Sequence, residues 1–475
     1  MNTLRTIALQ KLTRIAPKYL PFADVATERV PLSQLLRLSL FQVTVGMALV
    51  LMVGTLNRVM IVELEVPATL VAMMLALPLL SAPIRAFIGF KSDTHKSALG
   101  LRRLPYIWKG TMYQFGGFAI MPFALLVLSG YAEAVDAPRW VGLSSAALAF
   151  LLVGAGGHMV QTVGLALATD LVREEDRPKV VGLMYVMLLL GMVASALIFG
   201  ALLTEYTPGR MIQVIQGSAV VTVALNLFAM WKQEPRNRQR AQEMQSAPAQ
   251  DFWVSWKALM RKPGMKNLLI VLGFGTFGFS MADVLLEPYG GHALGFSVAE
   301  TTRLTAILAG GTFVGFSLAA RWLSERRDAV GLSTVGAAIG IPGFVLIILS
   351  SVYGGGLVFV CGVLLTGLGA GLFGHATLTA IIGSAPKEQI GLSLGMWGAV
   401  QATCAGIGFS LAGLMRDLLA LGSFYPGLQR QTPYTVVFMI EVVFLILAIL
   451  ASFQLATRRS GGLVFKPRPE PVEEP

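Results

Sequence analysis

Residues 85–111 read RAFIGFKSDTHKSALGLRRLPYIWKGT and join two long apolar runs of the chain. The stretch places Gly89 and Asp93 four residues apart, followed by cations that include Arg102 and Arg103. A carboxylate in such a place can accept hydrogen bonds from a helix N-terminus or pair with an arginine. The pattern predicts a polar hinge between two membrane helices, and these four residues are candidates for a cytoplasmic latch between two helix bundles. The alternative is that the cations only mark the cytoplasmic side of the membrane.

This hinge resembles the loop between the second and third helices of major facilitator transporters, whose usual form is Gly-x-x-x-Asp followed by a short basic run. Gly89 and Asp93 match that form, whereas the pair Arg102 and Arg103 comes nine residues after the Asp, later than usual.

The composition indicates an integral membrane protein. The chain has 475 residues, of which 55% are hydrophobic and only 13% are charged, with a mean hydropathy of +0.68. A soluble domain carries roughly 25% charged residues. The two cysteines lie in apolar runs and offer neither a disulfide framework nor a metal site. We also expect no signal peptide, because residues 1–20 lack a compact apolar core.

Twelve apolar segments are long enough to cross a hydrocarbon core of roughly 30 Å. They lie near residues 38–60, 67–90, 105–130, 140–171, 180–205, 209–231, 266–289, 299–322, 330–351, 356–383, 390–419 and 434–456. We therefore predict an all-α membrane protein with the major facilitator fold, made of two six-helix halves. Binding sites in such folds lie between the halves near the bilayer midplane.

These spans divide the chain into five parts. We predict a basic amphipathic segment at 1–37 that lies on membrane lipids, a six-helix bundle at 38–231, a cytoplasmic linker at 232–263, a second six-helix bundle at 264–457, and a disordered cytoplasmic tail at 458–475. Most of the 37 Lys and Arg residues fall on the side that carries the termini and the linker. This distribution predicts a multi-pass membrane protein with both termini cytoplasmic. It also explains the net charge of +11 without a nucleic-acid partner.

A glycine-rich stretch in the fourth span carries the most specific candidates for binding. His158 and Gln161 lie one helical turn apart among glycines, and the tenth span has a similar stretch that ends at His375. A neutral imidazole on a glycine-flattened wall suits a planar tetrapyrrole, whose central metal it can ligate. The alternative is that the glycines let helices pack closely while the histidines bond across them.

Acidic residues inside or at the ends of spans form a second set of candidates. Asp283 and Glu287 lie at i and i+4 in the seventh span, where they are candidates for proton or ion binding; the alternative is a helix end broken by Pro and Gly. Asp170, at the cytoplasmic end of the fourth span, is a gate or capping charge in preference to a proton carrier. We also expect an ion pair near the end of the first span, formed by Arg58 and Glu63. Glu441 is expected to face the bundle interior.

Enzyme motifs are missing from the sequence. It has no phosphate-binding loop, no zinc-ligand spacing and no Gly-x-Ser-x-Gly elbow. An ATP-driven pump and a hydrolase are therefore disfavoured, and we expect no enzymatic activity.

Four longer motifs carry a closer resemblance: NRVMIVEL at 57–64, RRLPYIWKGT at 102–111, GHMVQTVGLALATD at 157–170 and LLEPYGG at 285–291. They resemble the PucC/LhaA family, the bacteriochlorophyll-delivery branch of the major facilitator superfamily. The resemblance covers the chain from the first span to the last, apart from the linker and the tail. It implies a protein of the intracytoplasmic membrane of purple phototrophic bacteria that assembles light-harvesting antenna complexes and holds or delivers bacteriochlorophyll, with carotenoid as a second, less favoured pigment.

The partners that this resemblance implies are antenna polypeptides, the reaction centre–LH1 core complex and bacteriochlorophyll synthase. Chain length and the basic N-terminal helix incline the assignment to the LhaA branch, which serves the core antenna LH1, over the branch that serves the peripheral antenna LH2. The alternative function is a proton-coupled secondary transporter of a small molecule, loaded through Asp283 and Glu287.

Overall fold

The computed structural model describes residues 30–80, 88, 92, 101, 103–130, 136–173, 176–234, 252–324, 328–353, 355–384, 390–421 and 431–460. Across these ranges every regular element is a helix. The N-terminal half contains α2 (Leu32–Leu38), α3 (Leu40–Leu49), the π-helical η2 (Val50–Leu56) and η3 (Val59–Glu63), α4 (Ala68–Leu80), α6 (Leu104–Ser129), α7 (Arg139–Leu171), α8 (Arg177–Leu202) and α9 (Pro208–Met230). The C-terminal half contains α12 (Met265–Leu294), α13 (Val298–Ser324), α14 (Ala329–Tyr353), α15 (Gly356–Gly383), α16 (Ile390–Leu421) and α17 (Thr432–Ser460). A short helix, α11 (Phe252–Met260), precedes α12 in the segment predicted as a linker.

The spans agree with the prediction in number and order, with differences at their ends. Eleven described helices are long and apolar enough to cross a membrane, and α4 is a shorter apolar helix of 13 residues. The predicted continuation of α4 over 81–87 lies outside the described residues. The first span starts at Leu32, inside the segment predicted to lie on the membrane surface, because the extended backbone of Pro31 begins a helix there.

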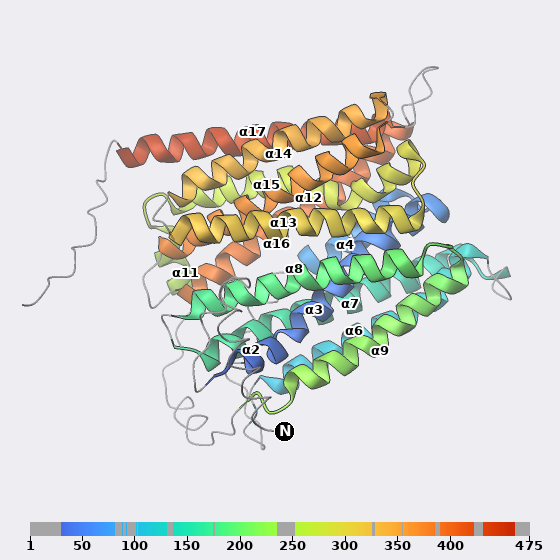
Figure 1. Cartoon of the computed structure of the whole chain (residues 1–475), viewed down its shortest axis with the longest axis horizontal. Coiled ribbons are helices and arrows are strands. Elements are labelled where there is room, and N and C mark those ends of the chain that lie inside the picture. Colours follow the sequence, from blue (N-terminus) through green and yellow to red (C-terminus); the bar gives the residue numbers. More distant parts are fainter. Residues whose placement is uncertain are drawn as a thin grey trace, which may run out of the picture.

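The helices lie side by side along one direction, and two bundles can be distinguished (Figure 1). Packing between the bundles is made by α8 against α13 and by α4 against α16. The first described helix, α2, and the last described residues of α17 lie at the same end of the molecule, on the left of Figure 1. We call this end the Arg103 end, after a residue near the start of α6, and the opposite end the Arg58 end, after a residue between η2 and η3.

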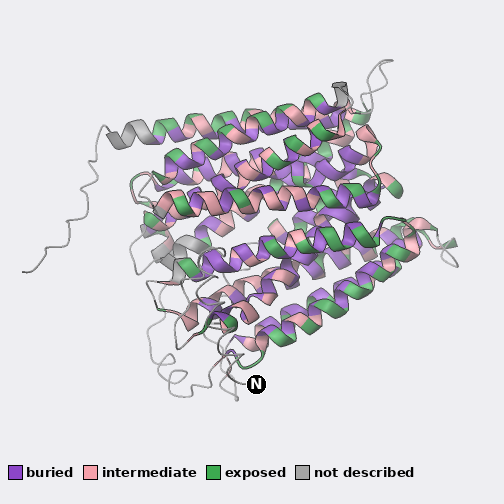
Figure 2. Ribbon diagram, in the orientation of Figure 1, coloured by how far each residue is buried: buried purple, intermediate pink, exposed green. Residues whose placement is uncertain are grey.

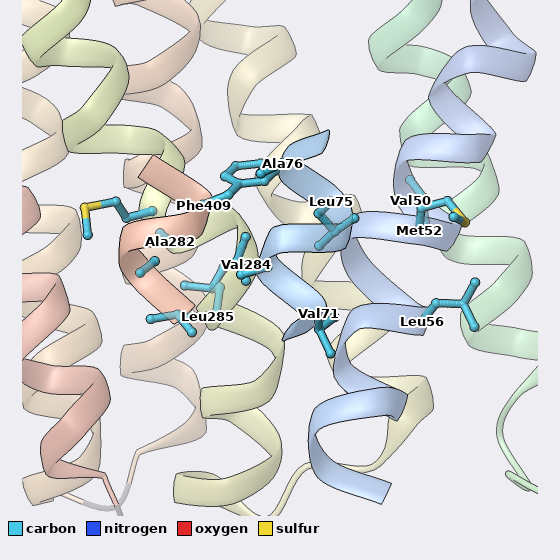
Figure 3. Close-up of a cluster of buried hydrophobic side chains, with 14 of the residues drawn as sticks. Val50, Met52, Leu56, Val71, Leu75, Ala76, Ala282, Val284, Leu285 and Phe409 are labelled. Carbon is cyan, nitrogen blue, oxygen red and sulfur yellow. The ribbon is translucent and has the colours of Figure 1, made fainter. Parts of the chain in front are cut away.

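One apolar core joins the two halves. It includes Leu56, Val71, Val284, Leu285 and Phe409, which come from η2, α4, α12 and α16. In Figure 3 these side chains lie between neighbouring helices, with Phe409 beside Ala76. The outward faces of the peripheral helices remain exposed and apolar (Figure 2), as expected for surfaces that contact lipid.

Candidate functional site

At the Arg58 end, a side chain of the first half completes the backbone of a helix in the second half. Pro288 lies inside α12 and has no N–H, so the carbonyl of Val284, four residues earlier, loses its helical partner. Asn57 is fully buried, and its Nδ2 donates to Val284 O at 2.6 Å. The break that Pro288 makes in α12 is therefore matched by one amide from the first span, which joins the halves.

The predicted ion pair of Arg58 and Glu63 is confirmed, and it also reaches across the halves. The guanidinium of Arg58 is buried, and Nη1 contacts Glu63 while Nη2 donates to Phe296 O at 2.9 Å. Tyr206, in the loop between α8 and α9, lies near this pair. Burial and the Glu63 carboxylate raise the pKa of the Tyr206 phenol to about 12, against the opposing effect of Arg58. The phenol therefore stays neutral beside the ion pair.

A polar contact between η2 and α13 lies beside this ion pair. Thr55 and Thr302 are fully buried, and their hydroxyl oxygens are 3.1 Å apart. Glu287 of α12 accepts a hydrogen bond from Thr305 of α13. A Cβ at Gly54 would lie 2.5 Å from Glu287 Oε1, so only glycine leaves room for this carboxyl group. The π-helical geometry of η2 brings Gly54 to that position; such irregular turns often mark functional sites.

A second link between the halves caps a helix. Asp417 of α16 accepts hydrogen bonds from the backbone N–H and the hydroxyl of Thr69, both at 2.7 Å, in the first turn of α4. Arg416 pairs with Asp417 at 2.8 Å and lies 5.2 Å from the centroid of the Tyr434 ring. A carboxylate at a helix N-terminus is stabilising, so α4 depends on the other half for its cap. Together these contacts close the Arg58 end.

The predicted acidic pair in α12 occupies two different environments. Glu287 is 3% exposed, whereas Asp283, one turn earlier, is exposed. Glu441 of α17 is fully buried, as predicted, and accepts a hydrogen bond from the backbone N–H of Ala282. Three carboxyl groups therefore surround one and a half turns of α12, but the described residues contain no group of three or more acidic, His or Cys side chains placed to hold a metal ion.

At the Arg103 end, Arg103 and Asp170 form an ion pair. Arg103 Nε lies 3.2 Å from Asp170 Oδ2, and Nη1 donates to Ser92 Oγ at 2.7 Å. The carboxylate of Glu234 accepts from the backbone N–H groups of Arg103 and Leu104 at 3.0 to 3.1 Å, at the start of α6. These contacts stay within the first half, so they do not themselves join two bundles. Of the other predicted latch residues, Gly89, Asp93 and Arg102 lie outside the described part of the chain.

The glycines around His158 are mostly used for helix packing. A Cβ at Gly156 would lie 2.5 Å from Gly110 O, and one at Gly154 would lie 2.3 Å from Pro78 Cγ. At Gly157, by contrast, the nearest atom is Gln114 Nε2 at 3.4 Å, which is an ordinary contact. Gly157 therefore faces Gln114 without a close backbone contact, while its neighbours bring α4 and α6 close to α7.

Two buried glutamines adjoin this position. Gln114 of α6 is fully buried, and neither Nε2 nor Oε1 has a hydrogen-bond partner. Gln42 of α3 is also fully buried; its Oε1 accepts from Gln161 at 3.4 Å, while its Nε2 has no partner. Buried amides are normally satisfied, so these unpaired atoms indicate a missing polar partner. We did not predict either glutamine, although both are polar residues inside predicted spans and that signal is present in the sequence.

His375 lies in an aromatic cluster where the halves meet. Its ring packs edge-on against Phe316 of α13, with centroids 4.2 Å apart. Tyr185 of α8 lies 6.3 Å from Phe316 and 6.5 Å from Trp397 of α16, again between ring centroids. His158 and His375 therefore sit in different surroundings, and only His158 directly follows a glycine that faces an unpaired buried amide.

Comparison with known proteins supports the sequence resemblance. The family model described as PUCC protein matches residues 55–460. The chain is 64% identical to Protein PucC of Rhodobacter capsulatus, with 96% of this chain and 99% of that protein aligned. The chain belongs to the PucC family.

Two further relatives are more distant. The chain is 46% identical to a Rhodobacter capsulatus protein described as the uncharacterized protein in the puhA-bchM intergenic region, over 97% of this chain and 96% of that protein. It is 26% identical to the bacteriochlorophyll synthase 44.5 kDa chain of Rhodobacter capsulatus, over 90% and 96% of the two chains.

Solved structures show the fold. A bacterial homologue of the lysosomal transporter Spinster, in an inward-facing conformation, superimposes with a TM-score of 0.65 at 17% identity, covering 90% of this chain and 96% of that one. The D-xylose–proton symporter gives a TM-score of 0.66 at 12% identity, covering 89% and 96%. The predicted major facilitator fold of this PucC-family chain is confirmed.

Proposed function

We propose that this chain is an assembly factor for photosynthetic light-harvesting antenna, and that it holds bacteriochlorophyll in its first half for transfer to antenna polypeptides. Family membership supports the role in photosynthesis. One structural observation supports the pigment site: Gln114 is fully buried with both amide atoms unpaired. Its Nε2 lies beside Gly157, the residue that precedes His158 in the sequence.

The residues around Gly157 suit the polar groups of such a pigment. Bacteriochlorophyll would supply a magnesium ion that takes a nitrogen ligand and a ring that carries carbonyl groups. His158 would provide the imidazole nitrogen, and the unpaired N–H groups of Gln114 and Gln42 would donate to carbonyl oxygens. Gly157 would keep a Cβ away from the Gln114 amide. Gln161, which contacts Gln42, would orient that amide. Carotenoid fits less well, because a polyene offers nothing to these donors.

A third buried amide in the first half, that of Asn226, shows that poor packing of this bundle is not the cause of the unpaired glutamines. Asn226 of α9 is also fully buried in the first half, and both of its amide atoms are satisfied. Its Nδ2 donates to Thr111 at 3.0 Å and its Oδ1 accepts from Thr44 at 2.9 Å. The same bundle thus satisfies one buried amide and leaves Gln114, one turn from Thr111, without a partner.

Family membership also supports a proposal for the antenna complex that the chain assembles and for the membrane in which it is located. Sequence features favoured the core antenna, whereas the identity of 64% to a protein named PucC favours the PucC branch. We therefore propose the peripheral antenna as client and keep the core antenna as the alternative. The location would be the bacterial inner, intracytoplasmic membrane, with the Arg103 end cytoplasmic. The relationship to a bacteriochlorophyll synthase chain supports a synthase as the pigment donor.

The second candidate function is proton-coupled transport. The structural likeness to transporters and the carboxyl groups of Asp283 and Glu287 favour it. Uptake of a solute into proteoliposomes that requires a pH gradient, in protein that carries no pigment, would replace the first proposal.

The test is purification of the chain in mild detergent from a phototrophic host, followed by an absorption spectrum and identification of small co-purifying peptides. We expect bacteriochlorophyll, and antenna polypeptides of the peripheral complex. His158→Ala and Gln114→Leu should each reduce the pigment per protein at least several-fold, while His375→Ala serves as the matched histidine control. Full pigment content in both of the first two variants would remove this site from the proposal. Core antenna peptides alone would reassign the client.

A further inference from the structure

The junction of the two halves holds a buried carboxyl group without a balancing charge. Glu287 is 3% exposed, its Oε1 accepts the Thr305 hydroxyl, and its Oε2 has no hydrogen-bond partner. The glycine at position 54 leaves room for it against η2. An ionised carboxylate in such a place is costly unless a cation or several donors face it.

The charged groups that face this junction do not supply the missing charge. Arg58 contacts Glu63 and the carbonyl of Phe296, so its charge is already balanced by an acid. Arg303 of α13 points to the other side, where it donates to Gly200 O on α8. Asp283 on the same helix and Glu441 on α17 are themselves acidic. With Glu287 ionised, the junction would carry an excess negative charge.

The unpaired buried atoms at this junction also indicate that Glu287 is protonated. Asn57 Oδ1 is buried without a partner, as is Glu287 Oε2, and both are acceptors. The unpaired donor beside them is Arg58 Nε. Asn57 contacts Val284 and Gly54 adjoins Glu287, so the two acceptors belong to the same crossing of η2 and α12. A proton on one carboxyl oxygen removes the excess charge and turns an acceptor into a donor.

We propose that Glu287 is a proton-binding site at the junction of the halves, and that its proton holds the Arg58 end closed. Asp283 lies one turn earlier on α12 with an exposed side chain, so it is the neighbouring acid through which the proton would reach Glu287. On deprotonation the carboxylate gains solvation only where the halves separate, so loss of the proton opens this end. The proposal stands apart from the pigment role and holds for an assembly factor and a transporter alike.

The sign and size of the effect follow from linkage. The closed state binds one proton more than the open state over the pH range in which Glu287 is ionised in the open state and still protonated in the closed state. The ratio of open to closed molecules therefore rises about tenfold for each pH unit in that range. The closed state is favoured at low pH, and the opening is driven by a rise in pH.

The experiment measures the separation of the halves directly. Spin labels are attached at Glu205→Cys and Leu357→Cys, two exposed positions near the Arg58 end, one in each half. The background carries Cys361→Ser and Cys404→Ser, and the full chain is held in nanodiscs between pH 5 and pH 9. We expect double electron–electron resonance to show a short distance at low pH and a growing long-distance population as the pH rises.

Matched variants decide which group is responsible. Glu287→Gln mimics the protonated acid, so it should fold and remain at the short distance at every pH. Glu441→Gln removes another buried acid whose contact stays within the second half, and it should keep the pH dependence. A pH response that persists in Glu287→Gln, an equal loss in Glu441→Gln, or a Glu287→Gln protein that fails to fold would each overturn the proposal. So would a closed state that requires sodium at fixed pH, since a cation would then occupy the junction.

Discussion

Two adjacent glycines separate the packing role of the α7 stretch from its binding role. Gly156→Ala would place a Cβ 2.5 Å from Gly110 O and 2.7 Å from Gln114 N, both backbone atoms of α6. Backbone cannot rotate away, so α6 and α7 must separate. We expect the free energy of unfolding to fall by about 1–3 kcal/mol, the usual cost of overpacking. Gly157→Ala places its Cβ 3.4 Å from the mobile end of Gln114, and we expect a change within about 1 kcal/mol.

The two variants are a matched pair because both glycines lie in the middle of one helix. The gain in helix propensity from Gly to Ala, about 1 kcal/mol at most, is the same for both and cancels in the comparison. Thermal unfolding of the pigment-free protein in one detergent measures the difference. Pigment content gives the second readout: Gly157→Ala should lower it while leaving stability unchanged. Equal destabilisation by the two variants would refute the assignment of Gly156 to packing and Gly157 to the site.

Three further outcomes are expected. Gln114→Leu should raise the unfolding free energy of the pigment-free protein by about 1–3 kcal/mol, since it removes an unsatisfied buried amide; a fall in melting temperature would contradict this. Asn57→Leu should lower the same free energy by about 1–3 kcal/mol, because Val284 O loses its donor, and an unchanged melting temperature would contradict that. In a Cys361→Ser, Cys404→Ser background, Thr55→Cys with Thr302→Cys should form a disulfide on oxidation, seen as a mobility shift reversed by reductant, because the hydroxyls are 3.1 Å apart. Failure to cross-link would contradict the contact between η2 and α13 at the Arg58 end.

The number and order of the spans could be predicted because apolar length is a local property of the sequence. Their ends could not be predicted as well. Pro31 starts the first helix at Leu32, six residues before the predicted start, since a proline that can terminate one helix can also begin another. The π-helical turns of η2 and η3 were not predicted either. They depend on Gly54 and Asn57 meeting α12 and α13, which are contacts between distant parts of the chain.

Among the candidate residues, too, the features set by local sequence could be predicted and the contacts between distant parts of the chain could not. The ion pair of Arg58 and Glu63 and the buried position of Glu441 follow from charge inside a span, and both were predicted. The contacts that residues make with distant parts of the chain were not predicted. Thr69 and Asp417 are 348 positions apart, and nothing local marks either as a cap. Gln114 was overlooked because a lone glutamine in an apolar run is unremarkable until its neighbours are known to leave it unpaired.

The two halves differ in how they use their buried polar groups. In the first half the unpaired buried atoms include those of two neutral amides, Gln114 and Gln42, which need donors or acceptors of a ligand and have no charge to exchange. In the second half they include one oxygen each of Glu287 and Glu441, carboxyl groups that can satisfy themselves by taking up a proton. A pigment site and a proton site can therefore coexist without sharing a residue. The Asn57 contact with Val284 joins the first span to α12, so a change at Glu287 would reach the first half through that span. Pigment retention that varies with pH in the wild type but not in Glu287→Gln would be the consequence of that coupling.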